Sequence, residues 1–410
     1  MSKLQELIDR LCPDGVEFKP LGEVCEIKRG ERVTKNQVNN IGSYPVISGG
    51  VTPMGYLEKF NREANTITVA QYGTAGFVNW QDKRFWANDI CYSLFPADVL
   101  DNRFLYYFLK NSSPIIDKLV NRDAVPFHLP QNNISNISIP IPPLEVQDEI
   151  VKILDRFADY AAELQAELQA RRLQYEYYRN LLLTFNPSAY GCGTDDAQKI
   201  SVIARGGHSY EIQWKTMGEI FEMRNGYTPS KNKPEFWENG TIPWFRMEDI
   251  RENGRILADS IQHITPASIK GKGLFEANTF ILATTATIGE HALLIADSLA
   301  NQRFTNLKVR KSLANLLDTK FIFYYMFIVD EFCKNNTNVS GFASVDMGKL
   351  KQMPFPIPPL ELQEKIVAIL DRFETLVNDL SKGLPAEIEA VKARYEYYRN
   401  KLLTFNPLSA

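Results

Sequence analysis

The stretch IPPLEVQDEIVKILDRF at residues 141–157 decides the fold, because it returns 216 residues later as IPPLELQEKIVAILDRF at residues 357–373. Further along, YEYYRN at 175–180 returns at 395–400, and both copies run on to LLTFNP. Two matches of this length cannot arise by chance, and self-similarity at a fixed spacing is the signature of a tandem repeat. The chain is therefore predicted to consist of two equivalent halves.

Outward from these segments the two halves match more weakly, as in LGEV at 21–24 with MGEI at 217–220 and FLYY at 104–107 with FIFY at 321–324. Each half is thus a diverged globular head followed by a nearly identical helix. Shared helices with divergent heads predict one scaffold that carries two binding specificities. The predicted parts are a first head domain at 1–143, a central spacer helix at 144–186, a linker at 187–214, a second head domain at 215–359 and a C-terminal spacer helix at 360–406.

Both predicted helices carry apolar residues in alternating steps of four and three, which is the heptad pattern of a coiled coil. In the second helix two steps of four follow each other at Leu384, which indicates a stutter. Gly383 and Pro385 stand at the same point, so we expect a kink or break there. The residues expected in the seam are Ile150, Leu154, Phe157, Leu164, Leu168, Tyr178, Ile366, Leu370, Phe373, Leu380 and Tyr398.

The two helices are predicted to form an antiparallel pair that holds the heads apart. The tandem AELQAELQ at 162–169 is then a length unit, since four residues add about 6 Å to a helix, comparable to one or two base-pair steps. Structural packing alone is the competing interpretation, and it is the commoner role of such a helix. Two near-identical copies in one chain favour a ruler.

Composition indicates a multi-domain globular protein, with 44% hydrophobic and 23% charged residues among 410. Each head is predicted to be of mixed α/β class, because residues 65–70 and 89–95 have the composition of strands and residues 101–120 are typical of a helix. The longest apolar run, 321–329, is too short to span a bilayer, and the start MSKLQELIDRL is typical of an amphipathic helix, so we expect a cytoplasmic protein without a membrane partner. The five cysteines are scattered and the four histidines lack ligand spacing, so no metal site is expected.

The net charge of −3 argues against a strongly basic nucleic-acid binder. The helical segments 144–185 and 360–405 together hold 16 acidic and 12 basic residues, so the rest of the chain is nearly neutral. DNA contact would have to come from local patches.

Such patches occur in both heads. Loop QYGTAG at 71–76 follows a predicted strand, and TTATIG at 284–289 stands at the matching place; glycines there allow close backbone approach, and Gln and Thr can pair with base edges or phosphates. Basic residues beside glycines at 28–35 and 224–233 suit phosphate contact. Ordinary turns and solvated charged faces are the competing interpretations. The candidate DNA-binding residues are Lys28, Arg29, Arg32, Lys35, Gln71, Tyr72, Thr74, Arg122, His128, Arg224, Lys231, Lys233, Arg246, Thr284, Thr285, Thr287 and Lys349.

No enzyme signature is present: the sequence lacks an adenine-methyltransferase motif, a GxxxxGK[ST] phosphate loop and a GxSxG elbow. We therefore expect no catalytic residues. A coiled-coil adaptor that binds proteins through its heads, without DNA specificity, remains the alternative function.

Two variable heads, each followed by a helix that opens with IPPLxxQ, resemble the specificity subunits of type I restriction-modification systems over nearly the whole chain. The AELQ tandem is similar to that of the subgroup with tetrapeptide repeats in the central helix. The resemblance implies that each head reads half of a split, asymmetric DNA site, while the helices set the gap and dock two adenine-methyltransferase subunits.

Two motor-nuclease restriction subunits would join this assembly, and S-adenosylmethionine, ATP and Mg²⁺ would be bound by the partner subunits. The resemblance also implies a pseudo-twofold match between the segments at 16–18 and 212–214. Without its partners, the chain is expected to self-associate through exposed helical seams.

Overall fold

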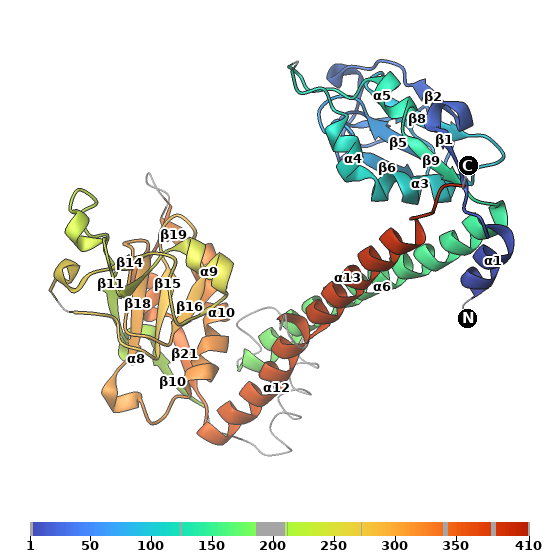
Figure 1. Cartoon of the computed structure of the whole chain (residues 1–410). Helices are drawn as coiled ribbons and strands as arrows, with labels where there is room; N and C mark the ends of the chain where they lie inside the picture. Colours follow the sequence, from blue (N-terminus) through green and yellow to red (C-terminus); the bar gives the residue numbers. More distant parts are fainter. Residues whose placement is uncertain are drawn as a thin grey trace. The chain divides into compact units, whose positions relative to one another are not determined.

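The structure is a computed structural model that describes residues 3–123, 125–185, 210, 212–271, 273–338, 343–378 and 383–408. The chain divides into two compact units, one formed by residues 1–166 with 386–410 and the other by residues 167–385. Most of the predicted linker 187–214, and the seam residue Leu380, lie outside the described residues. Figure 1 shows mixed α/β heads and long helices, which confirms the predicted fold class.

The first head is built around an antiparallel sheet of four strands in the order β2-β8-β5-β6. A three-stranded sheet, β4-β3-β7, and the pair β1-β9 complete it. Its elements are α1 (Lys3–Leu11), β1 (Glu17–Pro20), α2 (Leu21–Val24), β2 (Cys25–Arg29), η1 (Lys35–Gln37), β3 (Tyr44–Ile47), β4 (Tyr56–Leu57), β5 (Thr66–Ala70), β6 (Val78–Gln81), β7 (Trp86–Ala87), β8 (Cys91–Pro96), α3 (Asn102–Asn111), α4 (Ser113–Lys118), α5 (Gln131–Ser135) and β9 (Ser138–Ile141).

The second head repeats this topology as β11-β18-β15-β16 and adds β13 at the edge. The sheet β14-β12-β17 and the pair β10-β21 also recur, and β19-β20 forms a further ribbon. Its elements are β10 (Gln213–Thr216), α8 (Met217–Ile220), β11 (Phe221–Asn225), η3 (Pro234–Phe236), β12 (Ile242–Phe245), α9 (Met247–Asn253), β13 (Ile256–Leu257), β14 (His263–Ile264), η4 (Pro266–Ser268), β15 (Thr279–Ala283), β16 (His291–Leu294), β17 (Leu299–Ala300), β18 (Phe304–Val309), η5 (Lys311–Leu313), α10 (Thr319–Asn335), β19 (Thr337–Asn338), β20 (Ser344–Val345), α11 (Met347–Gln352) and β21 (Pro354–Ile357).

The central helix α6 (Leu144–Leu183) contributes to both units, and each unit pairs part of it with one C-terminal helix. In the first unit, Phe157 stacks on Tyr398 of α13 (Leu384–Leu402) with ring centroids 5.7 Å apart, and α13 runs beside α6 in Figure 1. In the second unit, Tyr178 stacks on Phe373 of α12 (Leu360–Asn378), also at 5.7 Å. Later residues of α6 meet earlier residues of the C-terminal helices, so the pairing is antiparallel.

Most of the predicted seam is buried in these helices. Leu164 and Leu168, one from each AELQ unit, are 6% and 7% exposed. Tyr398 differs from the prediction, because 39% of its surface stays exposed although its ring stacks on Phe157. The described seam residues that are buried are Ile150, Leu154, Leu164, Leu168, Ile366 and Leu370.

The C-terminal helix is interrupted where Gly383 and Pro385 predicted a break: α12 is described as far as Asn378, Gly383 is not helical, and α13 begins at Leu384. A side chain at Gly383 would meet the carbonyl oxygens of Thr375 and Leu376 at 2.4 and 2.7 Å, so the turn requires glycine. Pro385 lies in the first turn of α13, where its missing N–H costs no helical hydrogen bond.

The repeated glutamine of the IPPLxxQ motif fastens each helix to its own head. Gln147 is fully buried; its Nε2 donates to the Val99 and Pro142 carbonyls at 2.9 and 2.7 Å, and its Oε1 accepts from the Asp101 amide at 2.7 Å. Gln363 makes the same three contacts in the second head, with the Leu316 and Pro358 carbonyls and the Asp318 amide. The recurrence of this glutamine therefore has a structural cause.

The repeated aspartate of LDRF makes a second link. Asp155 accepts hydrogen bonds from the Tyr107 hydroxyl and from Arg103, whose Nε lies 2.9 Å away. Asp371 does the same with the Tyr324 hydroxyl at 2.6 Å and the Lys320 ammonium at 2.7 Å. Both aspartates thus join the long helices to α3 and α10.

The YEYYRN repeat also contacts the heads. In the first unit, Nε of Arg399 donates to Oδ1 of Asn111, at the end of α3, over 3.1 Å. In the second unit, the Arg179 guanidinium lies 3.9 Å from the ring centre of Phe327 on α10. The arginine of the α6 copy therefore contacts the second head, and that of the α13 copy contacts the first.

The first unit closes around the two ends of the described chain. Val16 forms a parallel bridge with Pro407, and its amide donates to the Asn406 carbonyl at 2.9 Å. Gly15 has φ +100°, and a side chain there would meet the Asn406 and Pro407 carbonyl oxygens at 2.6 Å. The first unit is thus assembled from both ends of the sequence.

Candidate nucleic-acid interface

In the first head, the loop at 71–76 and the hairpin at 121–128 form one surface. The Leu129 amide donates to the Gln71 carbonyl at 2.8 Å, and Tyr72 forms a bridge with His128. The rings of Tyr72 and His128 stack with centroids 5.5 Å apart. Three candidates from two separate parts of the sequence, Gln71 with Tyr72 and His128, are therefore neighbours.

The strand β2 brings the predicted basic cluster to the same place. The Arg29 guanidinium lies 5.8 Å from the ring centre of Tyr92, whose hydroxyl donates to the Leu129 carbonyl at 3.0 Å. Burial raises the pKa of Tyr92, so its hydroxyl remains a donor at neutral pH. Through Tyr92, Arg29 is connected to the base of the hairpin.

The other basic residues of this cluster differ in whether they form ion pairs within the head. Lys28 is exposed but pairs with Glu26 at 2.8 Å and lies over the ring of Phe95. Arg32 and Lys35 are exposed, and neither forms an ion pair within the described residues. Arg32 and Lys35 are consequently the cations of this cluster that are most available for a phosphate.

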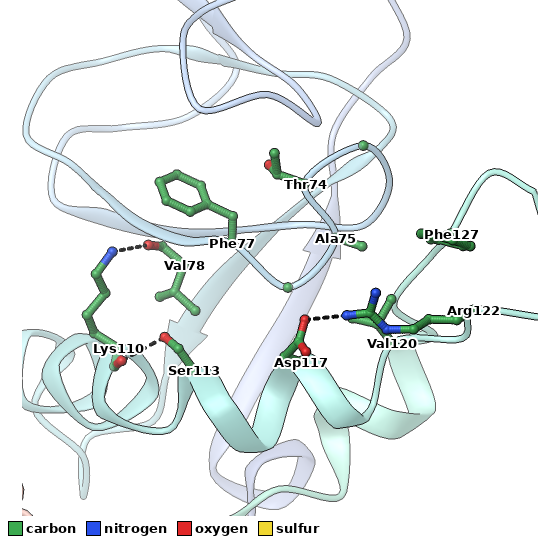
Figure 2. Close-up of a pocket in the computed structure, with 12 residues that line it drawn as sticks. Thr74, Ala75, Phe77, Val78, Lys110, Ser113, Asp117, Val120, Arg122 and Phe127 are labelled. Carbon is green, nitrogen blue, oxygen red and sulfur yellow. Dashed lines mark hydrogen bonds and ion pairs between the residues drawn. The ribbon is translucent and has the colours of Figure 1, made fainter. Parts of the chain in front are cut away.

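A cavity of about 380 Å³ lies beneath the loop, between it and helices α3 and α4 (Figure 2). Arg122 lines it, paired with Asp117 at 2.7 Å, and its guanidinium lies 5.7 Å from the ring centre of Phe127. Lys110 donates to the Val78 carbonyl at 3.3 Å, and burial lowers the pKa of its ammonium. The cavity thus has aromatic, cationic and hydroxyl groups on its wall.

Glycines and main-chain contacts fix the loop above this cavity. Gly73 and Gly76 have φ of +76° and +86°, which side chains disfavour. Thr74 donates through its amide and its hydroxyl to the Gly49 carbonyl, at 2.8 and 2.9 Å. Thr74 remains exposed, whereas Gln71 is only 4% exposed, so its side chain supports the head from inside.

The second head builds its matching surface from hydroxyl groups. Thr284 is buried, its hydroxyl lies 3.0 Å from that of Thr305, and Thr305 donates to Asn225 Oδ1 at 2.9 Å. The Val345 amide donates to the Thr284 carbonyl at 2.9 Å, and Thr285 forms a bridge with Ser344. Thr284, like Gln71, is therefore placed inside the head, while Thr285 and Thr287 are partly exposed.

The space below the second loop is occupied. A side chain at Gly289 would meet the Asp330 carbonyl oxygen at 2.5 Å and Lys334 Cγ at 2.8 Å. His291 and Asp330 are buried there, with Nδ1 and Oδ2 2.7 Å apart, and Arg255 Nη1 lies 3.4 Å from the same carboxylate. The first head has Val78 at the start of β6 where the second has His291 at the start of β16.

The basic candidates of the second head differ in exposure: some pack against the head, and others are exposed. Arg224 donates to the Leu274 carbonyl at 2.7 Å, lies over Phe275, and has its pKa lowered by burial, so it supports the head. Arg246 is partly buried beside Trp244, and Lys233 is 3.8 Å from Glu235. Lys231 and Lys349 are exposed and form no ion pair within the described residues.

Arg303 is a candidate that the sequence reasoning missed. Its carbonyl accepts the Thr284 amide at 2.9 Å, which puts it beside the second loop, and its side chain is exposed without an ion pair in the described part of the chain. The offset of 213 between Gly76 and Gly289 aligns Arg303 with Ile90, which is apolar, so the repeat gave no signal for a cation at this position.

No described helix is both long and apolar enough to cross a membrane. No described group of three or more His, Cys, Asp or Glu residues is arranged to hold a metal ion.

Comparison with known proteins agrees with the architecture. The family model of the type I restriction modification DNA specificity domain matches residues 13–171 and 211–390. The chain is 32% identical to the EcoR124I/EcoR124II specificity subunit of Escherichia coli, across 99% of this chain and 97% of that protein. It is 50% identical to the EcoprrI specificity subunit of Escherichia coli over 202 residues, which cover 48% of this chain and about half of that protein.

Solved structures share the fold. A type I restriction-modification S subunit from M. genitalium aligns with a TM-score of 0.53 at 19% identity, over 95% of this chain and 96% of that one. A chain from a study of complex assembly in a type I system aligns with a TM-score of 0.59 at 16% identity, over 95% and 98%. The two matched heads, the repeated helices and the full-length relative confirm the resemblance: the chain belongs to the family of type I restriction-modification specificity subunits.

Proposed function

We propose that this chain is the DNA-recognition subunit of a type I restriction-modification complex and that each head reads one half of a split, asymmetric site. The observation that carries the proposal is the recurrence of one surface in both heads: a strand, a glycine-containing loop and a neighbouring ribbon. These surfaces differ in side chains, whereas the helix attachments through Gln147 and Gln363 are the same. Divergent surfaces on a common scaffold suit two different half-sites.

The exposed cations would contact phosphates and set the position of each head on the duplex, while loop and hairpin side chains would approach the base edges. Arg32, Lys35 and Thr74 fill these roles best in the first head. In the second head, Lys231, Arg303 and Thr285 do so. The coiled-coil adaptor without DNA specificity lacks support, because both heads match a DNA specificity domain.

The chain would act without catalytic residues of its own. Two adenine-methyltransferase subunits would dock on the long helices and supply the S-adenosylmethionine chemistry. Two motor-nuclease subunits would add ATP- and Mg²⁺-dependent cleavage. The complex would work in the cytoplasm, where the host DNA lies.

The helix α6 would set the gap between the half-sites. Its AELQ units place Leu164 and Leu168 in the buried seam, so removing one unit shortens the helix by about 6 Å while keeping a leucine in register. The gap in the recognised sequence should then shrink by one or two base pairs.

The test is co-expression with the methyltransferase subunit, followed by genome-wide mapping of methylated adenines with and without this chain. The proposal predicts methylation of a split motif only when the chain is present, and a shorter gap when one AELQ unit is deleted. Methylation that is absent, or independent of this chain, would refute it. An unchanged gap after the deletion would refute the ruler alone.

A further inference from the structure

The hairpin at 121–128 projects from the first head, as the teal loop of that unit in Figure 1. Its two sides are joined by the Asn121 amide on the His128 carbonyl at 2.7 Å and the reverse bond at 3.2 Å. Stacking of His128 on Tyr72 connects the base of the hairpin to the loop at 71–76. The tip is therefore carried on a defined base at the candidate DNA surface.

The described residues of the tip are unusually apolar for such an exposed place. Val125 is 94% exposed and Phe127 is 45% exposed. Burial of a valine or phenylalanine side chain is favourable, and in the folded head neither of these two side chains is fully covered. An apolar pair at the end of a projecting hairpin points to a surface that is covered in a complex.

Cations surround the base of the same hairpin. The Arg122 guanidinium lies 5.7 Å from the Phe127 ring centre and is paired with Asp117, an exposed carboxylate that it would exchange for a phosphate. The Leu129 carbonyl accepts from the hydroxyl of Tyr92, over which Arg29 lies. An apolar tip with cations behind it has the composition of a wedge that enters between stacked bases while the cations contact flanking phosphates.

We propose that Val125 and Phe127 form such a wedge and open one base step in the half-site read by the first head. This inference rests on the proposed DNA-recognition function. The first head would then recognise its half-site partly by how easily one step unstacks, since pyrimidine–purine steps open at lower cost than others. A protein partner fits the tip less well, because two side chains fall far short of the roughly 800 Å² per partner of a standard interface.

The test uses the assembled methyltransferase and duplexes of its mapped motif, with the fluorescent base 2-aminopurine placed at successive positions in both half-sites. Stacking quenches this probe. The wild-type complex should brighten it at one step besides the methylated adenine, in one half-site. The double variant Val125→Ser with Phe127→Ser should abolish that signal and weaken specific binding about tenfold, a loss similar to that of one mismatched base pair.

The matched control is Val99→Ser, which removes another exposed valine of the same head, 51% exposed, in the segment bonded to Gln147. It should leave both fluorescence and affinity unchanged. The wedge is wrong if no additional step brightens, or if brightening survives in the double variant. It is also wrong if that variant loses the methyltransferase on size-exclusion chromatography, because the tip would then be a protein contact. A wild-type complex with no sequence-specific methylation would instead overturn the proposed function as well.

Discussion

Replacing Gln147 by leucine should loosen the first head from its helix without disturbing the second head. The substitution keeps the size of a buried side chain but removes three hydrogen bonds, to the Val99 and Pro142 carbonyls and the Asp101 amide. Asp101 is also the N-cap of α3, since its carboxylate accepts the Phe104 amide at 2.7 Å. The variant therefore leaves partnerless groups at the point where α3 begins.

A buried group that loses its partner costs about 1–3 kcal/mol, and of the three bonds the one to the Pro142 carbonyl is fully buried while the other two are partly buried. The leucine recovers part of this cost by its own burial. We expect a net loss of about 3 kcal/mol in the local stability of the first unit. Hydrogen–deuterium exchange of the full chain measures this locally, which matters because a two-unit protein does not unfold in one step. Amides of residues 99–109 should exchange roughly 100-fold faster, the factor that corresponds to about 3 kcal/mol.

Two controls belong to this experiment. Gln169→Leu changes an exposed glutamine of the same helix and should leave exchange in residues 99–109 unaltered. Gln363→Leu should transfer the effect to the start of α10, where Asp318 occupies the equivalent N-cap. An unchanged amide exchange rate in residues 99–109 of the Gln147 variant, or equally faster exchange in both units, would refute the idea that this glutamine anchors only the first head to its helix.

Three further predictions concern binding, closure and thiol chemistry. Arg32→Ala should reduce the slope of log K against log salt for DNA binding by about one, because one phosphate contact is lost; a fluorescence-anisotropy salt titration with an unchanged slope would remove Arg32 from the interface. Gly15→Ala should detach the C-terminal segment at 404–408 and make it sensitive to limited proteolysis, because the new side chain would meet two carbonyl oxygens at 2.6 Å. The control is Gly254→Ala, which also has a positive φ but would place no atom within 4 Å of the new side chain, and in that variant segment 404–408 should stay protected from proteolysis. Burial raises the pKa of Cys25 and Cys91 to about 12, so at pH 8 both remain thiols and should resist iodoacetamide in the folded chain. Alkylation should appear only as the pH approaches 12 or after denaturation, and modification at pH 8, measured by mass spectrometry, would contradict this.

The sequence alone determined the architecture, because its signals are local or repeated. Heptad spacing predicted which faces of the long helices are buried, and Gly383 with Pro385 predicted the interruption between α12 and α13. The recurrence of residues 141–157 at 357–373 predicted two equivalent halves. The loops at 71–76 and 284–289 were also found as a matching pair, since strand and glycine patterns mark them.

Only the tertiary structure decided what the polar residues of these segments do. Gln71 and Thr284 look like base-contacting residues in the loop sequences, yet their side chains are buried. Gln147 and Asp155 look like exposed helix residues, yet they bind groups near positions 99–107, more than 40 residues earlier. The stacking of His128 on Tyr72 places the hairpin at 121–128 beside the loop at 71–76, and this contact could not be predicted from the sequence. Periodicity within a sequence reports which face of one element is apolar, but the hydrogen-bond partner of a polar side chain is set by elements that meet only after the chain has folded.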